Sequence, residues 1–165
     1  MAFDTLKRAF WFLALCLAQA LVLNRVQLFN CAMPLLYVYF VIMFPRNYPK
    51  WAILVWSFAL GLTIDLFANT PGVATTSLTL VGAVQPYLLT LFLPRDANDD
   101  LPVGASTLGW GKFAAFTLLI VVLFCLAFFS LEAFNYFNWQ HWLACAGGSA
   151  ALTIALILTL ETIRK

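Results

Sequence analysis

The sequence predicts an all-α integral membrane protein, a compact bundle of about six transmembrane helices in a single domain. Three observations lead to this prediction: the apolar composition, apolar runs that approach membrane-spanning length, and the placement of basic residues between the runs. Of the 165 residues, 64% are hydrophobic and 10% are charged, and the mean hydropathy is +0.92. Soluble domains are about half apolar and about one quarter charged, so we expect lipid to surround much of this chain.

Apolar runs that approach the roughly 30 Å hydrocarbon core define the predicted helices. They occupy residues 9–23, 28–44, 51–66, 75–93, 113–131 and 142–160. Several are shorter than the usual ~20 residues, so we expect them to include flanking residues, stand nearly upright or thin the bilayer locally. Turn-forming residues such as Asn, Pro and Gly separate the runs. The sequence shows no internal repeat and no separate soluble domain, so we predict a single membrane domain over residues 1–165.

The basic residues predict the orientation of these helices. If the N-terminus is cytoplasmic, alternation of the runs leaves Arg25 as the only basic residue on the outer side. The cytoplasmic side then holds Lys7, Arg8, Arg46, Lys50, Arg95, Lys112, Arg164 and Lys165. This excess follows the positive-inside rule and favours an even number of crossings with both termini in the cytoplasm. Tryptophans at the run ends mark the membrane interface: Trp51, Trp110, Trp139 and Trp142.

The N-terminus also imitates a secretory signal. Lys7-Arg8, an apolar run and Ala18-Gln19-Ala20 together have the order of a cleavable leader. We favour an uncleaved first helix, because the rest of the chain is equally apolar and an ordinary first span has the same pattern. The alternative is that residues 1–20 are processed.

Metal, enzyme and nucleic-acid signatures are missing from the sequence. The cysteines Cys16, Cys31, Cys125 and Cys145 form no CxxC pair, and we interpret them as small buried hydrophobic residues. His141 is the only histidine, and its place beside Trp139 and Trp142 favours interface anchoring. There is no Walker A loop, GxSxG elbow or HExxH motif, and the scattered basic residues predict no nucleic-acid partner. We therefore expect no enzyme activity, no metal and no cofactor.

Asp65 is the most informative polar residue of the third run. Ser57, Gly61 and Asp65 are spaced at i, i+4 and i+8, so two small residues and an acid share one helix face. Such faces pack closely against other helices in lipid. Asp65 could be an ion or substrate ligand, or it could accept hydrogen bonds from backbone amides of the following turn; we favour this structural role.

Other features of the later runs have simpler interpretations. Gln85-Pro86 predicts a kink in the fourth run and, as an alternative, a cavity lining. The small residues Gly147, Ala151 and Ala155 predict a face that packs against another helix, in this chain or in a partner. Glu132 and Glu161 are interpreted as interfacial end charges. Residues 94–111 are interpreted as a solvated connection, with docking of a cytoplasmic partner as the alternative.

The segment from Gly61 to Gly72 resembles MreD, the rod shape-determining membrane protein family of bacteria. It has the order Gly-Leu-x-x-Asp-Leu-Phe followed by Pro-Gly; elsewhere the resemblance is one of length and predicted span count. The matching motif residues are Gly61, Asp65, Asn69, Pro71 and Gly72. The resemblance implies a non-catalytic scaffold of the cell-elongation complex in the inner membrane, which guides cell shape and lateral peptidoglycan synthesis.

The implied partners are MreC, the MreB filament, RodA and the elongation penicillin-binding protein. MreD proteins in turn resemble the substrate-binding components of energy-coupling-factor vitamin transporters, which implies a similar six-helix bundle. It also supplies the alternative function, capture of a vitamin or other small molecule, with Asp65 and Gln85 as ligands. The small number of buried polar residues favours the scaffold.

Overall fold

The computed structural model describes residues 2–21, 25, 36–69, 72–96, 103–132 and 139–164. These residues form α-helices and no strand, which confirms the all-α prediction. The seven helices are α1 (Ala2–Leu21), α2 (Val38–Ile42), α3 (Lys50–Ala68), α4 (Val73–Phe92), α5 (Ala105–Leu108), α6 (Trp110–Glu132) and α7 (Trp139–Arg164). Four of them, α3, α4, α6 and α7, are long and apolar enough to cross a membrane. The chain is a multi-pass membrane protein with four candidate transmembrane helices.

Two of the predicted runs look different in the structure. Residues 9–21 of the run at 9–23 lie in α1, which begins earlier and carries Asp4, Lys7 and Arg8 on its first turns. This helix is not among the four candidate spans, and residues 22 and 23 lie outside the described part of the chain. Of the run at 28–44, the described residues 36–44 contain only the five-residue α2. Pro45 follows directly, and a proline disfavours helical geometry at the residue before it. Residues 28–35 lie outside the described part of the chain.

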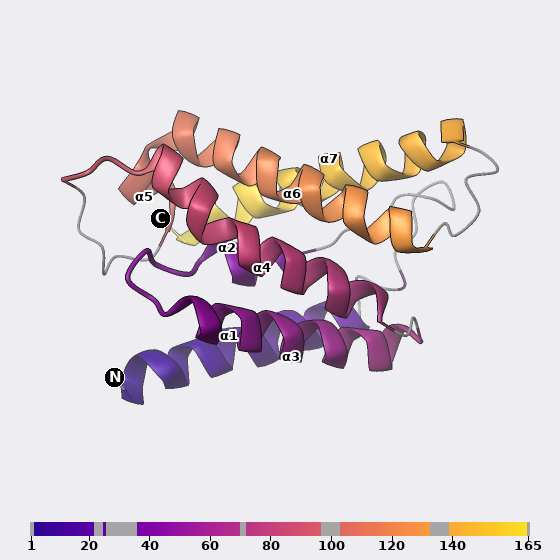
Figure 1. The fold of residues 1–165 in the computed structure, drawn as a ribbon, viewed down its shortest axis with the longest axis horizontal. Coiled ribbons are helices and arrows are strands. Elements are labelled where there is room, and N and C mark those ends of the chain that lie inside the picture. Colours follow the sequence, from indigo (N-terminus) through magenta and orange to yellow (C-terminus); the bar gives the residue numbers. More distant parts are fainter. Residues whose placement is uncertain are drawn as a thin grey trace.

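The long helices lie side by side around α2 (Figure 1). Neighbouring pairs are α1 with α3, α3 with α4, α4 with α6, and α6 with α7, while α2 contacts α1, α4 and α6. Every residue of α2 is at most 3% exposed, so this short helix forms the centre of the core. Edge-to-face ring contacts attach it to its neighbours, among them Tyr37 on Phe124 of α6 and Phe40 on Phe12 of α1.

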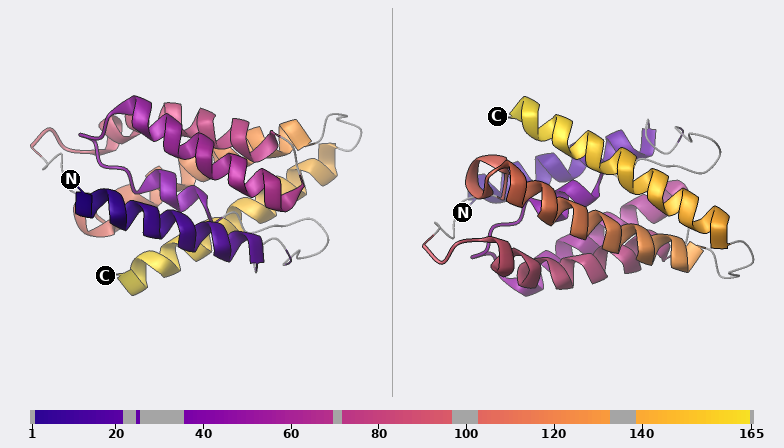
Figure 2. Two further views of the ribbon diagram at one scale, coloured as in Figure 1. Left: turned by 90° about the horizontal axis from the view of Figure 1, so that it is seen from below. Right: turned by 90° about the horizontal axis from the view of Figure 1, so that it is seen from above.

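The bundle has two distinct ends. Both termini and α5 lie at one end, which we call the terminal end, and α3 meets α4 at the opposite end, which we call the turn end (Figure 2). The start of α6 belongs to the terminal end and the start of α7 to the turn end. Candidate site residues lie at both ends.

The outward faces of α1 and α3 are apolar and bulky. On α3 the exposed stripe consists of Trp51, Val55, Phe58, Leu62 and Leu66. On α1 it consists of Phe3, Leu6, Phe10, Leu13, Leu17 and Leu21. Continuous apolar stripes of this length suit contact with lipid chains, because large side chains of this kind are costly to expose to water.

Candidate functional site

At the turn end, Asp65 caps the first turn of α4. Its Oδ1 accepts a hydrogen bond from the Ala74 amide at 2.9 Å, and its Oδ2 accepts from the Thr75 amide at 3.0 Å and the Thr75 hydroxyl at 2.5 Å. The residue is 5% exposed. The first amides of a helix have no partner within the helix, and lipid chains cannot accept hydrogen bonds from them. The Asp65 carboxylate therefore supplies the acceptors for the Ala74 and Thr75 amides. These contacts correspond to the structural role considered for Asp65, with donors in α4 itself rather than in the preceding turn.

The backbone around the turn explains why a residue of α3 must supply this cap. Asn69 ends α3 in the left-handed region at φ 59°, and its amide donates to the Asp65 carbonyl. Gly72 occupies the N-cap position of α4 at φ 82°, where glycine is the least strained residue. Because glycine has no side-chain acceptor, the cap that Ser, Thr or Asp usually provides comes from Asp65. Thr70 and Pro71 lie outside the described residues.

Small residues set the distance between α3 and α4. A Cβ atom on Gly61 would lie 2.5 Å from the Thr75 Cα and 2.9 Å from the Ala74 carbonyl oxygen. Farther along, a Cβ atom on Gly82 would lie 2.6 Å from the Ser57 hydroxyl oxygen. Gly61 therefore permits the approach that brings Asp65 to α4, and Ser57 faces the same partner helix. Gly82 was not singled out in the sequence, although its spacing of seven residues from Thr75 places it on the same face.

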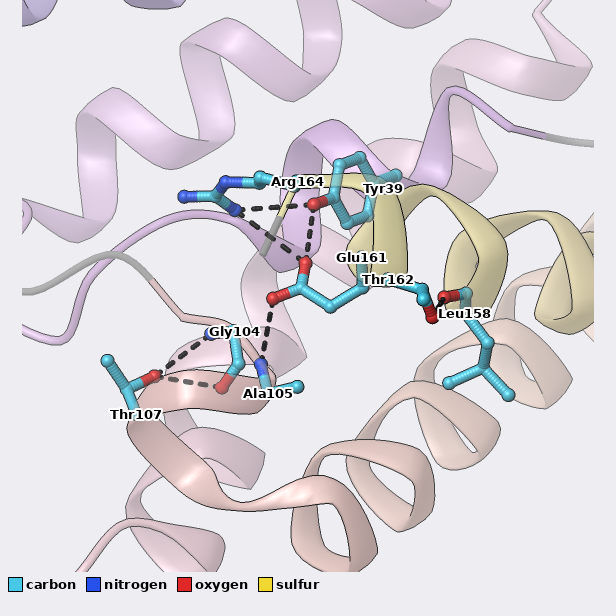
Figure 3. A network of polar contacts seen from close by, with 8 residues as sticks. All are labelled: Tyr39, Gly104, Ala105, Thr107, Leu158, Glu161, Thr162 and Arg164. Carbon is cyan, nitrogen blue, oxygen red and sulfur yellow. Dashed lines mark hydrogen bonds and ion pairs between the residues drawn. The ribbon is translucent and has the colours of Figure 1, made fainter.

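At the terminal end, a second buried carboxylate organises a polar network that the sequence interpretation missed (Figure 3). Glu161 of α7 is 4% exposed. Its Oε2 accepts a hydrogen bond from the Tyr39 hydroxyl at 2.7 Å, and its Oε1 accepts from the Ala105 amide at 2.8 Å. Arg164 lies 3.8 Å from Oε2 and donates to the Tyr39 hydroxyl at 3.2 Å. The interpretation of Glu161 as an interfacial end charge is wrong, because a surface charge needs none of these partners.

The network holds α5 in place. A Cβ atom on Gly104 would lie 2.6 Å from Glu161 Oε1, so a larger residue there would shift the carboxylate from its present place beside the Ala105 amide. The Thr107 hydroxyl accepts from the Gly104 amide and donates to the Gly104 carbonyl, which closes the turn. The prediction that residues 94–111 form a solvated connection is therefore wrong for 103–108, since Val103, Ala105 and Leu108 are buried.

One signal in the sequence could have identified Glu161. The buried face of α7 repeats every fourth residue, and Glu161 continues that repeat at the terminal end. The members are Ser149, Thr153, Ile157 and Glu161. Its partners Tyr39 and Ala105 are 122 and 56 residues away in the chain, so no local pattern predicts them.

Gln85 joins α4 to the end of α2. The side chain is fully buried, and its amide nitrogen donates to the Phe44 carbonyl at 3.2 Å. Its Oε1 has no hydrogen-bond partner among the described residues. Pro86 follows inside α4, and its missing amide leaves the Gly82 carbonyl without its helical donor. Gln85 thus contributes to packing between helices, and its Oε1 remains a buried acceptor without a donor among the described residues.

The small-residue stripe of α7 faces outward. Gly147, Ala151 and Ala155 are exposed, and a Cβ atom on Gly147 would meet nothing within 4 Å. Thr159 continues the same exposed row, and the larger Leu143 and Ile163, also exposed, lie at its two ends. The stripe therefore does not serve to pack α7 within the described part of this chain.

The cysteines differ from one another. Cys16 and Cys125 are free and buried, as expected for small hydrophobic residues, but Cys145 is disulfide-bonded. Within the described ranges no group of three or more His, Cys, Asp or Glu residues could hold a metal ion. His141 is exposed near the start of α7.

Comparison of the chain with protein-family models, with curated proteins and with solved structures gave no match. The residues and contacts above are therefore the basis for any functional proposal.

Proposed function

We propose that this protein is a non-catalytic membrane scaffold of a bacterial cell-elongation complex, with α7 as the helix that binds a partner. The observation that carries the proposal is the outward face of α7, where Gly147, Ala151 and Ala155 are exposed. Small residues let two helices in lipid approach closely enough to gain van der Waals contact along their backbones. A partner transmembrane helix is the occupant that such a face fits best.

The contrast with the other outward faces supports this assignment. The exposed stripes of α1 and α3 consist of large residues such as Phe10 and Phe58, which fill space against mobile lipid chains. The outward face of α7 has exposed large residues only near its two ends, at Leu143 and Ile163, and the small residues between them offer less apolar volume to lipid. By the resemblance to MreD, the partner helix belongs to MreC, RodA or the elongation penicillin-binding protein.

The polar residues of the motif support a scaffold rather than a binding pocket. Both oxygens of Asp65 accept hydrogen bonds from α4, and Gly61 is in contact with the α4 backbone. The motif that resembles MreD therefore has a structural task, which is to build the α3–α4 hairpin.

The proposed topology has six crossings in the inner membrane, with the terminal end in the cytoplasm. The two termini lie at the same end of the bundle (Figure 2), which supports an even number of crossings. Basic residues gather at that end, among them Lys7 and Arg8 on α1, Lys50 at the start of α3 and Arg164 at the end of α7. This side would face the MreB filament.

A second candidate function is capture of a vitamin or other small molecule for a transporter. The observation that favours it is Gln85 Oε1, which is buried and has no hydrogen-bond partner among the described residues. Such an atom costs free energy unless something binds it.

One experiment separates the two functions. The tagged chain is extracted from its native membrane in mild detergent, and the proteins that accompany it are identified by mass spectrometry. The scaffold proposal expects MreC, RodA or the elongation penicillin-binding protein. Recovery of a transporter coupling protein with its paired ATPases would reject the scaffold proposal. Gln85 would then be the leading candidate for a residue that binds the transported molecule.

A further inference from the structure

Residues 103–109, which we call the strap, form a small unit laid across the terminal end of the bundle. The strap contains the four-residue helix α5. A helix this short has no stability of its own, because nucleation costs more than its few hydrogen bonds return. Contacts with the rest of the bundle must therefore hold the strap in place.

The strap is held by apolar packing against the core and by a hydrogen bond to one carboxylate. Glu161 Oε1 accepts from the Ala105 amide at 2.8 Å, and Gly104 lies against the same oxygen. Val103 and Leu108 add apolar burial at 2% and 7% exposure. Gly109 then links the strap to α6 at a positive φ of 87°, which glycine adopts with little strain.

Glu161 has other partners that do not belong to the strap. Tyr39 donates to its Oε2 at 2.7 Å, and Arg164 lies 3.8 Å from that atom (Figure 3). If the Ala105 amide leaves, the carboxylate keeps one hydrogen bond and one cation. Release of the strap therefore avoids the large cost of an unpaired buried charge.

We propose that the strap is a releasable element of the terminal end and that Glu161 is its latch. In the closed state the Ala105 amide is bound to Glu161, and Ala105 and Leu108 are covered. In the open state Glu161 remains with Tyr39 and Arg164, and the strap swings about Gly109 into water. The device does not depend on the identity of the partner proteins.

Thiol accessibility tests the latch in the purified full-length chain. Ala105→Cys places a thiol at a position that is 4% exposed in the closed strap. Labelling with a water-soluble maleimide is followed over time by peptide mass spectrometry, alone and combined with Glu161→Ala, Glu161→Gln or Thr162→Ala. Cys125, buried in α6 at 2% exposure, serves as the internal control for an intact bundle.

Glu161→Ala should accelerate labelling of the introduced thiol by about tenfold or more, because it removes a hydrogen bond to a charged group. Glu161→Gln should accelerate it less, since the amide oxygen still accepts from the Ala105 backbone. Thr162→Ala, at the exposed neighbouring position, should have no effect, and Cys125 should stay unlabelled throughout. Unchanged labelling in Glu161→Ala would overturn the proposal. Simultaneous labelling of Cys125 would also overturn it, because Glu161 would then hold the whole bundle rather than the strap.

Discussion

Asp65 and Glu161 are both buried carboxylates that accept hydrogen bonds from backbone amides, yet they join very different parts of the chain. The amides bound by Asp65 are 9 and 10 residues away, within a single helical hairpin. The groups bound by Glu161 are 56 and 122 residues away, on α5 and on the core helix α2. A glycine lies close to each site: Gly61 against the α4 backbone in one case, and Gly104 against the Glu161 carboxylate itself in the other.

The Asp65 site stabilises the α3–α4 hairpin itself, whereas the Glu161 site connects helices that are already formed. The Asp65 cap forms together with the α3–α4 hairpin, since its donors are the first amides of α4. The Glu161 network can lose the strap and keep Tyr39 and Arg164. We therefore expect changes at the turn end to affect the whole fold and changes at the terminal end to act locally.

The largest effect should come from Gly61→Leu. Any side chain there collides with the α4 backbone at Thr75, so the helices must separate and Asp65 must lose its donors. We expect a loss of stability of about 3 kcal/mol or more, measured by thermal unfolding in detergent, and loss of function in a cell-shape complementation assay. Leu62→Ala, on the exposed face, is the matched control and should differ little from the parent chain. Equal behaviour of the two variants would contradict the close-packing argument.

Replacement of Asp65 should have the next largest effect, and the two substitutions should differ. Asp65→Leu leaves the Ala74 and Thr75 amides unsatisfied, at about 1–3 kcal/mol for each buried group. Asp65→Asn keeps one acceptor oxygen and should retain more stability and more function. Thermal unfolding and complementation, at matched protein levels, measure both. If the variants are equally inactive at normal levels and normal stability, the charge itself is required, and a ligand role for Asp65 gains support.

Tyr39→Phe should have a smaller effect. It removes one of the donors to Glu161 but leaves the Ala105 amide and Arg164, so we expect a loss of about 1–2 kcal/mol in thermal unfolding. Because Tyr39 lies outside the strap, labelling of the thiol introduced by Ala105→Cys should rise less than in Glu161→Ala. A loss as large as that of Gly61→Leu would mean that the terminal end is as cooperative as the turn end.

The sequence carried local information well. The spacing of Ser57, Gly61 and Asp65 predicted a close helix contact, because all of the partners lie within one hairpin. A structural role for Asp65 was also expected, but with donors in the following turn, whereas the donors are Ala74 and Thr75 of α4. The small residues of α7 predicted a flat helix face, although only the structure places that face outward. Apolar composition predicted helices in lipid for the same reason, since it depends on each segment alone.

Long-range contacts were beyond the sequence patterns. Glu161 looked like an end charge because Tyr39 and the Ala105 amide are brought to it only by packing of the bundle. Hydropathy alone predicted a continuous run at 28–44, but it does not register that Val38–Ile42 forms a short helix enclosed on all sides. The disulfide at Cys145 likewise depends on distance in space, not on a local motif.

The scaffold proposal is tested most directly at Gly147, where an added Cβ atom would meet nothing within 4 Å. The tagged protein with Gly147→Leu is compared with Ala115→Leu, which adds the same side chain at an exposed position of α6. Thermal unfolding in detergent and the quantity of each co-purifying membrane protein are measured for both. If α7 is the binding helix, both variants keep the stability of the parent chain, and recovery of the partner is lost only in Gly147→Leu. Full recovery of the partner with Gly147→Leu would contradict the assignment of α7 as the binding helix.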